Sequence, residues 1–415
     1  MEPIQDPFGK ANTGTDNKPS TEQLKAQLRQ LVEETLLAQG FTYSNGIICP
    51  AVQDPSRVQN TDKDNMRLLH ESSRLTELAE HVKFLSSNWV LLSYLANGSE
   101  VVPERIQPKL VPADSGVEAL IFKFFRLIHW SLPYSKGYGR RLKYLVIDEH
   151  NGKLIGLIGL QSPPISIQAR DRLYSYPEGK KVEMVNQSMD IYTLGAVPPY
   201  TFLLGGKLVA YAAACNEIRQ DYESRYNDRV TLINRQNIPA RLVFLTTTSA
   251  YGRSSQYQRL VYRGEPVATS IGYTSGSGTF HFPTPVYHKV KELLGALGLD
   301  TATGFGEGWQ KGPRRRLQQI SRALSIVGLD PKLVYHGIPR EVFLYPLIRN
   351  LSEYLSGKTI IPDYFDRPFA DLASWWKERW CLPRSTRNQS WTEFDASKYA
   401  EEAVRLMQRA TDAWN

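Results

Sequence analysis

A glycine pair followed by a lysine could hold a phosphate-bearing ligand. Gly205, Gly206 and Lys207 follow the apolar Leu204 and open an alanine-rich stretch that predicts a helix to about Tyr226. Glycines allow backbone N–H groups to approach a phosphate, and the N-terminus of a helix adds its dipole. The spacing differs from that of a nucleoside-triphosphate loop, so ATP is not implied. The alternative is that the pair only caps the helix.

A run of hydroxyl side chains, from Thr246 to Ser255, completes a short apolar stretch that predicts a buried strand. Side chains at the carboxyl end of a strand lie where α/β proteins usually bind ligands. Thr248 and Ser254 could therefore hydrogen-bond a ligand, and the guanidinium of Arg253 could bind a phosphate or a carboxylate. The alternative is a polar loop whose hydroxyls bond their own backbone.

Two further places could supply an acid or a base. His281 follows a glycine-rich stretch over residues 272–278 and could transfer a proton, although a hydrogen-bonded structural histidine is the alternative. Arg170 and Asp171 predict a salt bridge that orders the chain, and the alternative is a carboxylate that positions a base or a metal. Because no group of His, Asp and Glu has the spacing of metal ligands, we expect no metal site.

A cluster of basic residues near the C-terminal third is the strongest indication of a nucleic-acid surface. It consists of Trp309, Lys311, Arg314, Arg315, Arg316 and Arg322. Three arginines at the start of a helix oppose its dipole, and a bound phosphate would relieve that repulsion. Trp309 adds a ring for base stacking. The alternative is a solvated basic turn, and His336 and Arg340 either belong to the same surface or form a separate turn.

The composition is that of a globular protein with a basic surface. The 415 residues are 41% hydrophobic and 22% charged, and the formal net charge is +8. This charge favours a polyanionic partner such as nucleic acid, although many enzymes for nucleotide or CoA ligands are also basic. Cys49, Cys215 and Cys381 are far apart and are expected to be small buried hydrophobes rather than disulfide or zinc partners. Without a signal peptide or an apolar run that could span a bilayer, the sequence predicts a soluble, cytoplasmic protein.

The sequence predicts a mixed α/β (α+β) fold with helices at both ends. We expect a disordered leader over 1–19, a helical N-terminal region over 20–130, a central mixed-sheet domain over 131–285 and a mostly helical, basic C-terminal region over 286–415. A capping box of Ser20 and Gln23 predicts the first helix, and further helices are expected near 64–82, 84–96, 116–129 and 394–412. Asn151–Gly152, between two alternating apolar segments, predicts a hairpin, and strands are also expected near 189–197, 241–248 and 266–273.

The order of elements in the central region resembles the GNAT acyltransferase fold. A hairpin, a strand, the loop with Gly205 and Gly206, a helix and a buried strand precede Tyr257. The resemblance implies that the glycine loop binds the pyrophosphate of acetyl-CoA and that Tyr257 acts as general acid toward the leaving thiolate. The loop departs from the family pattern, which usually begins with Arg or Gln, because residues 202–204 are apolar here.

Several strings together resemble the DruA family of the bacterial Druantia anti-phage system. They lie at residues 130–142, 152–156, 194–200, 204–208, 246–257 and 336–341, and the resemblance covers roughly residues 65–385. It implies a role in anti-phage defence, with a helicase encoded nearby as a partner. It supplies no catalytic mechanism, and a role linked to transposons stays open.

The leading hypothesis is a defence protein that engages nucleic acid, with DNA favoured, or an intermediate of it. The rival hypothesis is an acyltransferase that modifies nucleobases or protein, with Tyr257, Ser254 and His281 as its catalytic residues. A third alternative is an assembly scaffold, in which Trp375, Trp376 and Trp380 would contact partners instead of the core.

Overall fold

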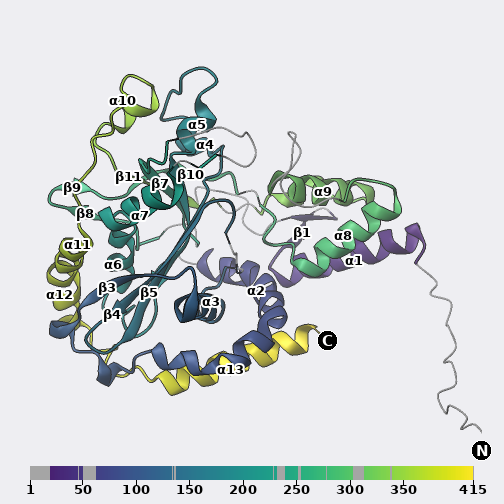
Figure 1. Cartoon of the computed structure of the whole chain (residues 1–415). Helices are drawn as coiled ribbons and strands as arrows, with labels where there is room; N and C mark the ends of the chain where they lie inside the picture. Colours follow the sequence, from purple (N-terminus) through teal and green to yellow (C-terminus); the bar gives the residue numbers. More distant parts are fainter. Residues whose placement is uncertain are drawn as a thin grey trace, which may run out of the picture.

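The computed structural model describes residues 19–44, 46–49, 62–132, 134, 137–227, 229–230, 239–250, 254–276, 278–301, 313–336 and 339–414. Figure 1 shows a central sheet with helices on both sides and a smaller group, containing α1, α8 and α9, beside it. The predicted leader over 1–19 falls almost entirely outside the described residues.

A seven-stranded mixed sheet forms the centre of the molecule, which confirms the predicted mixed α/β class. Its strand order is β10–β11–β7–β6–β5–β4–β3, and β6 and β7 are the parallel neighbours among otherwise antiparallel pairs. In this order the strands span Thr269–Tyr273, Glu341–Pro346, Phe244–Thr248, Ser188–Ala196, Lys153–Gln161, Arg141–Asp148 and Pro108–Pro112.

The hairpin of β4 and β5 forms as its sequence pattern predicts. Leu142 and Leu160 lie opposite each other in the register, and both are fully buried. The turn between the strands includes Gly152, whose φ of 70° lies in the left-handed region that glycine adopts without a steric penalty. The alternating apolar residues and the Asn-Gly turn therefore specify the same hairpin.

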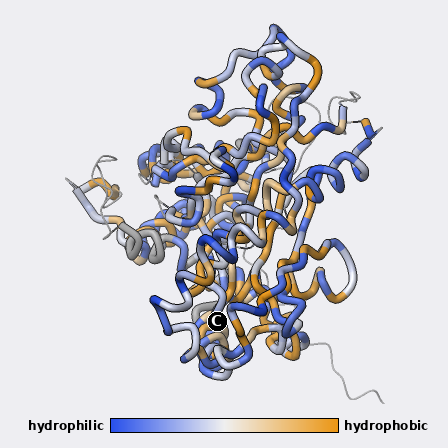
Figure 2. Tube along the Cα trace, turned by 90° about the vertical axis from the view of Figure 1, so that its left-hand side faces the viewer, coloured by the Kyte–Doolittle hydropathy of each residue, from blue (hydrophilic) through white to orange (hydrophobic). Residues whose placement is uncertain are grey.

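Helices cover both faces of the sheet, and the side chains of β4 alternate between them. Tyr144 and Val146 enter the hydrophobic cluster under one layer of helices, whereas Leu145 enters the cluster under the other layer. The first layer contains α6 (Gly205–Ala212), α7 (Asn216–Tyr226) and α11 (Phe369–Trp376). The second contains α2 (Asp62–Ser87), α3 (Gly116–His129) and α13 (Ala396–Trp414). In Figure 2 many hydrophobic segments run through the middle of the molecule.

A separate hydrophobic cluster joins the start of the chain to its last third. It contains α1 (Thr21–Ala38), β2 (Ile47–Cys49), α8 (Thr284–Ala296) and α9 (Pro313–Ile326), and β1 (Thr42–Ser44) pairs with β2. The predicted capping box is present, because Ser20 Oγ accepts from Gln23 N at 3.2 Å and Gln23 Oε1 accepts from Ser20 N at 2.8 Å. We call this unit the α1–α8–α9 module.

Short elements complete the described chain. Its short helices are α4 (Gln168–Asp171), α5 (Lys181–Val185), α10 (Leu351–Leu355) and α12 (Leu382–Arg387), and its short strands are β8 (Val261–Tyr262) and β9 (Glu265–Pro266). The 3-10 turns span Trp89–Tyr94, Gly98–Glu100, Pro103–Arg105 and Pro331–Val334, and Lys377–Cys381 is π-helical. Within the described ranges, no helix is both long enough and apolar enough to cross a bilayer.

Several elements differ from the sequence prediction. The two helices expected near 64–82 and 84–96 are one helix, α2, followed by a 3-10 turn. The alanine-rich helix divides into α6 and α7 around the buried segment 213–215. Strands β3 and β11 were not predicted, and both lie outside the 131–285 range expected for the sheet. The sheet therefore draws strands from the predicted N-terminal and C-terminal regions as well.

The three tryptophans near the C-terminus belong to the core and to a cavity wall. Trp376 is fully buried, and its Nε1 donates to the carbonyl oxygen of Leu204 at 2.9 Å. Trp375 packs against the same hydrophobic cluster and donates to the carbonyl oxygen of Val261 at 2.9 Å. Trp380 lines the cavity that is described below. These contacts do not fit the hypothesis in which the three rings form a partner surface.

Candidate functional site

The parallel strands β6 and β7 pair over three residues and then part. Ser188, Met189 and Asp190 lie opposite Phe244, Leu245 and Thr246. Beyond them, β6 stays paired with β5 as far as Ala196, and β7 stays paired with β11 as far as Thr248. An opening in the sheet therefore lies between two strands that are each held on their other side.

A β-bulge in β6 explains why the strands part. Thr193 lies opposite Gly159 and Ile191 lies opposite Leu160, so Tyr192 is the extra residue on β6. A bulge bends its strand and increases the local twist. The ring of Tyr192 packs over Gly159, where an added Cβ would come within 2.8 Å of the ring. The bulge therefore bends β6 next to Asp190, the last residue of β6 that pairs with β7.

A cavity of about 670 Å³ lies at the opening between the strands. Its wall includes residues 194–196 of β6, Thr201, Leu204, Gly206, Lys207, Ala250, residues 254–259 and Trp380, together with residues 129–132. The last group follows α3, on the opposite face of the sheet from α6 and Trp380. The wall of one cavity is therefore built by elements from both faces of the sheet.

Tyr257 lies in the wall of this cavity. Its ring packs 4.9 Å from that of Phe343, and its hydroxyl is hydrogen-bonded with Thr247. Thr247 in turn donates from Oγ1 to the carbonyl oxygen of Ile191 at 3.0 Å, next to the point where the strands part. Burial raises the pKa of Tyr257 to about 12, so the phenol keeps its proton at neutral pH. A protonated phenol at this position can act as a hydrogen-bond donor or a general acid.

The glycine pair lies at the edge of the cavity, but its two members differ. Gly205 is buried, its N–H donates to the carbonyl oxygen of Tyr200 at 2.8 Å, and a Cβ would clash with the same oxygen at 2.8 Å. Gly206 lines the cavity, where a Cβ would lie 3.2 Å from Gln256 Oε1. Leu204 precedes them in the left-handed conformation, with φ 60°. Only the second glycine is therefore in contact with the cavity.

Lys207 reaches into the turn that carries Tyr257. Its ammonium group donates to the carbonyl oxygens of Ser255 at 3.0 Å and Gln258 at 2.7 Å, and it lies 4.7 Å from the ring centre of Trp380. The side chain is 8% exposed, and burial lowers the pKa of Lys207 to about 8. The lysine predicted to bind phosphate thus holds a protein turn in place.

The remaining hydroxyl candidates make internal contacts. Ser254 lines the cavity, and its Oγ accepts from the backbone N–H of Gln256 at 3.3 Å. Thr248 Oγ1 accepts from Arg340 Nη2 at 2.7 Å, so these two predicted residues do meet. Arg253 lies outside the described residues.

Asp190 is a candidate that the sequence prediction missed. It lies in the last residue pair before the strands part, and its carboxylate accepts from Thr246 Oγ1 at 3.1 Å and from Gln161 Nε2 at 3.2 Å. Burial raises the pKa of Asp190 above its ordinary value of 3.8. A single charged residue in a mostly apolar strand was the signal that could have identified it.

His281 and His336 lie in a different part of the molecule, beside the α1–α8–α9 module. His281 is fully buried, its Nε2 donates to the carbonyl oxygen of Leu333 at 2.8 Å, and its ring lies 5.6 Å from that of His336. Burial lowers the pKa of His281 to about 4. Neither histidine belongs to the wall of the cavity. The structure thus separates His281 from Tyr257 and Ser254.

Two arginines of the predicted basic surface make contacts within the protein. Arg315 forms an ion pair with Asp300, and Arg316 Nη2 donates to the carbonyl oxygen of Phe282 at 2.7 Å. Arg322 is exposed on α9. Trp309, Lys311 and the side chain of Arg314 lie outside the described residues.

Two other predicted features concern ion pairs and metals. Arg170 is fully buried and lies 2.7 Å from Asp171 Oδ1, so the expected salt bridge forms. Among the described residues, Glu77, Glu80 and His81 place potential ligand atoms within 4.8 Å of one another on one helix. Such acidic groups are common without an ion, and this cluster carries no function in our interpretation.

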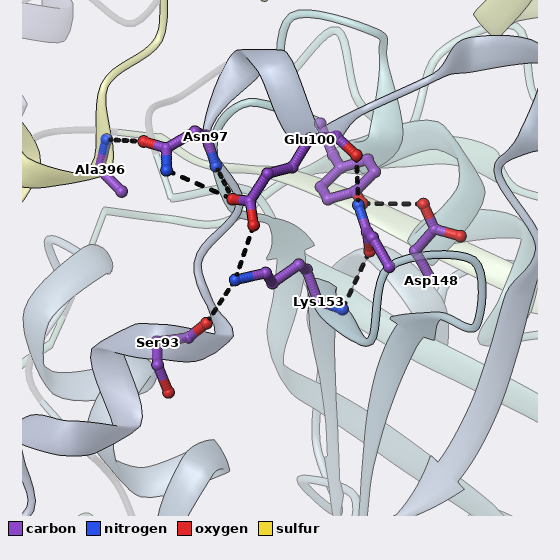
Figure 3. Close-up of polar contacts among 8 residues, drawn as sticks. Ser93, Asn97, Glu100, Asp148, Lys153 and Ala396 are labelled. Atoms are coloured by element: carbon purple, nitrogen blue, oxygen red, sulfur yellow. Dashed lines mark hydrogen bonds and ion pairs between the residues drawn. The ribbon is translucent and has the colours of Figure 1, made fainter.

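A polar network fixes the loop between β6 and α6, which carries part of the cavity wall (Figure 3). The Tyr200 hydroxyl donates to Asp148 Oδ2 at 2.9 Å and accepts from Asn151 Nδ2 at 2.9 Å. Asn151 also donates to the carbonyl oxygen of Glu100, whose carboxylate binds Lys153 at 3.1 Å. The β4–β5 turn therefore anchors the residues that precede Leu204.

The same network reaches the C-terminal helix. Glu100 accepts from the backbone N–H of Asn97 at 2.6 Å, and Asn97 Oδ1 accepts from the N–H of Ala396 at 2.9 Å, at the start of α13 (Figure 3). Farther along α13, Tyr399 contacts His129 Nδ1 through its hydroxyl at 3.1 Å. Because His129 lines the cavity, α13 supports the wall on that face of the sheet.

Comparisons with known proteins agree on one family. The model of a family described as Druantia protein DruA matches residues 60–357. A relative described as Druantia protein DruA, from Escherichia coli (strain UMEA 4076-1), is 38% identical over 367 residues, which cover 88% of each chain. No solved structure matches this chain.

Proposed function

Because the chain belongs to the DruA family, and is therefore a component of the Druantia anti-phage system, we propose that it binds an acyl thioester of coenzyme A in the cavity between β6 and β7 and transfers the acyl group to a nucleobase or a protein. The observation that carries this proposal is the lining of one cavity from both faces of the sheet. A group transfer needs a donor and an acceptor to meet, and we expect the two to approach the chamber from opposite faces of the sheet.

The arrangement of strands supports a GNAT-like topology for this domain. A single parallel pair, β6 and β7, is followed on one side by β5, β4 and β3 and on the other by β11 and β10, and α6 and α7 connect the parallel strands. Tyr257 lies on the turn after β7, at the opening between the strands. This is where the resemblance places the general acid.

The residues present fit the amide-bearing arm of coenzyme A better than its pyrophosphate. The opening offers strand backbone, and Gly206 leaves space at the wall, whereas Lys207 is already bonded to carbonyl oxygens. Arg259 is exposed at the cavity and is the cation that we expect near the phosphates. When bound, the thioester supplies an activated acyl group.

The roles of the protein residues follow from their protonation states. Tyr257 keeps its proton at neutral pH and can donate it to the sulfur as the C–S bond breaks. The acceptor forms the new bond to the acyl carbon and loses one proton. Asp190, in the last residue pair before the strands part, is the carboxylate that we expect to receive this proton.

A thermal-shift measurement tests ligand binding. We expect acetyl-CoA to raise the melting temperature of the wild-type protein. It should not change the melting temperature of Gly206→Trp, because the indole would project from the wall into the cavity. Ile361→Trp is the matched control, because Ile361 is 72% exposed and does not line the cavity. No shift of the wild type at millimolar acetyl-CoA would refute the proposal.

Engagement of nucleic acid, with DNA favoured, is a second proposal, which a different observation supports. The net charge is +8, and Arg322 stands exposed on α9, whereas Arg315 and Arg316 already contact the protein. We expect Arg322→Glu to weaken DNA retention and to reduce its salt dependence. Arg405→Glu changes an exposed arginine on α13 and is the matched control; equal retention by both variants and wild type would exclude α9 as the contact. Partner proteins of the system, including a helicase, are expected to act with the chain.

A further inference from the structure

The edge of β6 that faces the opening has lost its strand partner, and side chains replace it. Backbone N–H and C=O groups that are buried without a partner are strongly unfavourable. The carbonyl oxygen of Ile191 accepts from Thr247 Oγ1 at 3.0 Å, and that of Leu194 accepts from Gln256 Nε2 at 3.3 Å. Thr247 belongs to the neighbouring strand, whereas Gln256 belongs to the turn that follows it.

The backbone of Gln256 is held in place, and its side chain lies at the cavity. The Lys207 ammonium binds the flanking carbonyls of Ser255 and Gln258, and Ser254 Oγ accepts from the N–H of Gln256. The carboxamide lies over Gly206, the one residue of the glycine pair that lines the cavity, and Gln256 is only partly buried. Because only the side chain of Gln256 contacts the carbonyl oxygen of Leu194, rotation about its side-chain bonds would release this oxygen without moving the turn.

We propose that Gln256 is a gate. Its side-chain amide binds the carbonyl oxygen of Leu194 on β6 until an N–H group of a ligand displaces it. Its Nε2 donates to the same carbonyl oxygen, that of Leu194, that an incoming N–H would need. The gate therefore selects for ligands whose extended arm carries secondary amides, because only these can satisfy the carbonyl that Gln256 leaves. This inference rests on the proposed binding of a coenzyme A thioester and specifies which part of that ligand the strand edge recognises.

The test compares Gln256→Ala and Gln256→Leu with the wild type by calorimetry. The probes are pantetheine, which carries two amides, acetyl-CoA, and adenosine 3′,5′-bisphosphate, which carries none. We expect Gln256→Ala to bind pantetheine and acetyl-CoA about two- to tenfold more tightly, the range of one net hydrogen bond. Gln256→Leu keeps the side-chain volume but lacks the donor. Its affinity for pantetheine and acetyl-CoA should therefore exceed that of the wild type, but by less than the affinity of Gln256→Ala does. The bisphosphate should bind all three proteins equally.

The outcomes separate the gate from the proposed function. Weaker or equal binding of pantetheine by Gln256→Ala would overturn the gate, even if the wild type binds acetyl-CoA. An equal gain for the bisphosphate would also overturn it, because the effect would then not depend on amides. If Gln256→Ala gains affinity for pantetheine but the wild type does not bind acetyl-CoA, the gate stands and the thioester proposal fails. Binding of no probe by any variant overturns both.

Discussion

The ammonium group of Lys207 lies 2.7 Å from the carbonyl oxygen of Gln258, at the end of a turn that carries both Gln256 and Tyr257. One buried cation on α6 therefore sets the position of two side chains in the cavity wall. The contact connects the helix that follows β6 with the turn that follows β7, across the opening between these strands.

Replacing Lys207 should loosen this turn. Lys207→Met keeps the length of the side chain but removes the donors, and we expect the free energy of unfolding to fall by about 1–3 kcal/mol because buried carbonyl oxygens lose their partner. Amide exchange over residues 255–259 should become faster. Lys398→Met, at an exposed position on α13, is the control and should change neither. Unchanged exchange in Lys207→Met would show that the turn does not depend on the lysine.

Asp190→Asn should change the pH dependence of stability. Burial raises the pKa of Asp190, so the folded state binds more protons than the unfolded state above the ordinary value of 3.8, and stability falls as the pH rises through this window. Asparagine removes this effect. Relative to the wild type, Asp190→Asn should therefore have a higher melting temperature at pH 8 than it has at pH 4. The Gln161 amide can rotate so that its Oε1, which has no hydrogen-bond partner, accepts from the amide of the introduced asparagine.

Asp395→Asn is the control for that experiment and has the opposite sign. The N–H of Ser397 lowers the pKa of Asp395, so this carboxylate stabilises the fold above pH 3.8 and the contribution is lost as the pH falls. A parallel pH response of the two variants would contradict the assignment of Asp190 as a buried carboxyl group with a raised pKa.

Mild acid should loosen the α1–α8–α9 module. The unfolded chain protonates His281 near pH 6.5, whereas burial lowers the pKa of His281 to about 4 in the folded state, so stability falls as the pH drops from 6.5 to 4. Gln39 Nε2 donates to the carbonyl oxygen of His281 at 3.0 Å and links the end of α1 to this group. Amide exchange in α1 should therefore become faster as the pH falls.

His281→Phe should reduce this acid sensitivity by up to about 1.4 kcal/mol per pH unit, the contribution of one proton. His70 and His129 are also buried, with pKa values lowered to about 3 and about 4, and will keep part of the response in the variant. His150→Phe changes an exposed histidine in the β4–β5 turn and should leave the profile unchanged. Exchange in α1 at pH 5 that equals the exchange at neutral pH would contradict the prediction.

Tyr200→Phe should weaken the loop that leads into α6. The substitution removes the hydroxyl that bonds Asp148 and Asn151, and the buried Asp148 Oδ2 loses its partner, which should destabilise the protein by about 1–3 kcal/mol in urea unfolding. Tyr335→Phe, at a half-exposed tyrosine, is the control and should lie within about 0.5 kcal/mol of the wild type. Equal midpoints for the two variants would show that the network does not anchor the loop.

The elements that could be predicted are those whose signal is local. The capping box of Ser20, the Asn-Gly turn of the β4–β5 hairpin and the apolar spacing of α3 each depend on residues close in the chain. Strand β11 could not be found in this way, because Glu341–Pro346 is buried between β7 and β10 and follows a segment that had suggested a turn. Its place is set by partners far away in the sequence.

Some residues of the candidate site could likewise be predicted from the sequence, and others could not. Tyr257, Ser254, Gly206 and Lys207 were predicted, and the structure places them around one cavity. Gln256 and Asp190 were missed, since an amide that replaces a strand partner and a carboxyl group inside a sheet carry no motif. His281 was predicted for the site, yet it packs beside α8, because its distance from Tyr257 depends on the path of β10 and the segment after it.

The late position of β11 has a consequence for synthesis of the chain. Strands β7 and β10 have no common neighbour until residue 346 has been translated and has left the ribosome, so more than three quarters of the polypeptide emerges with an incomplete sheet. Helix α1, made first, meets α8 only after residue 296. Open strand edges on a nascent chain favour association with other chains. We therefore expect the partly formed sheet to be most prone to association with other chains before β11 has been made.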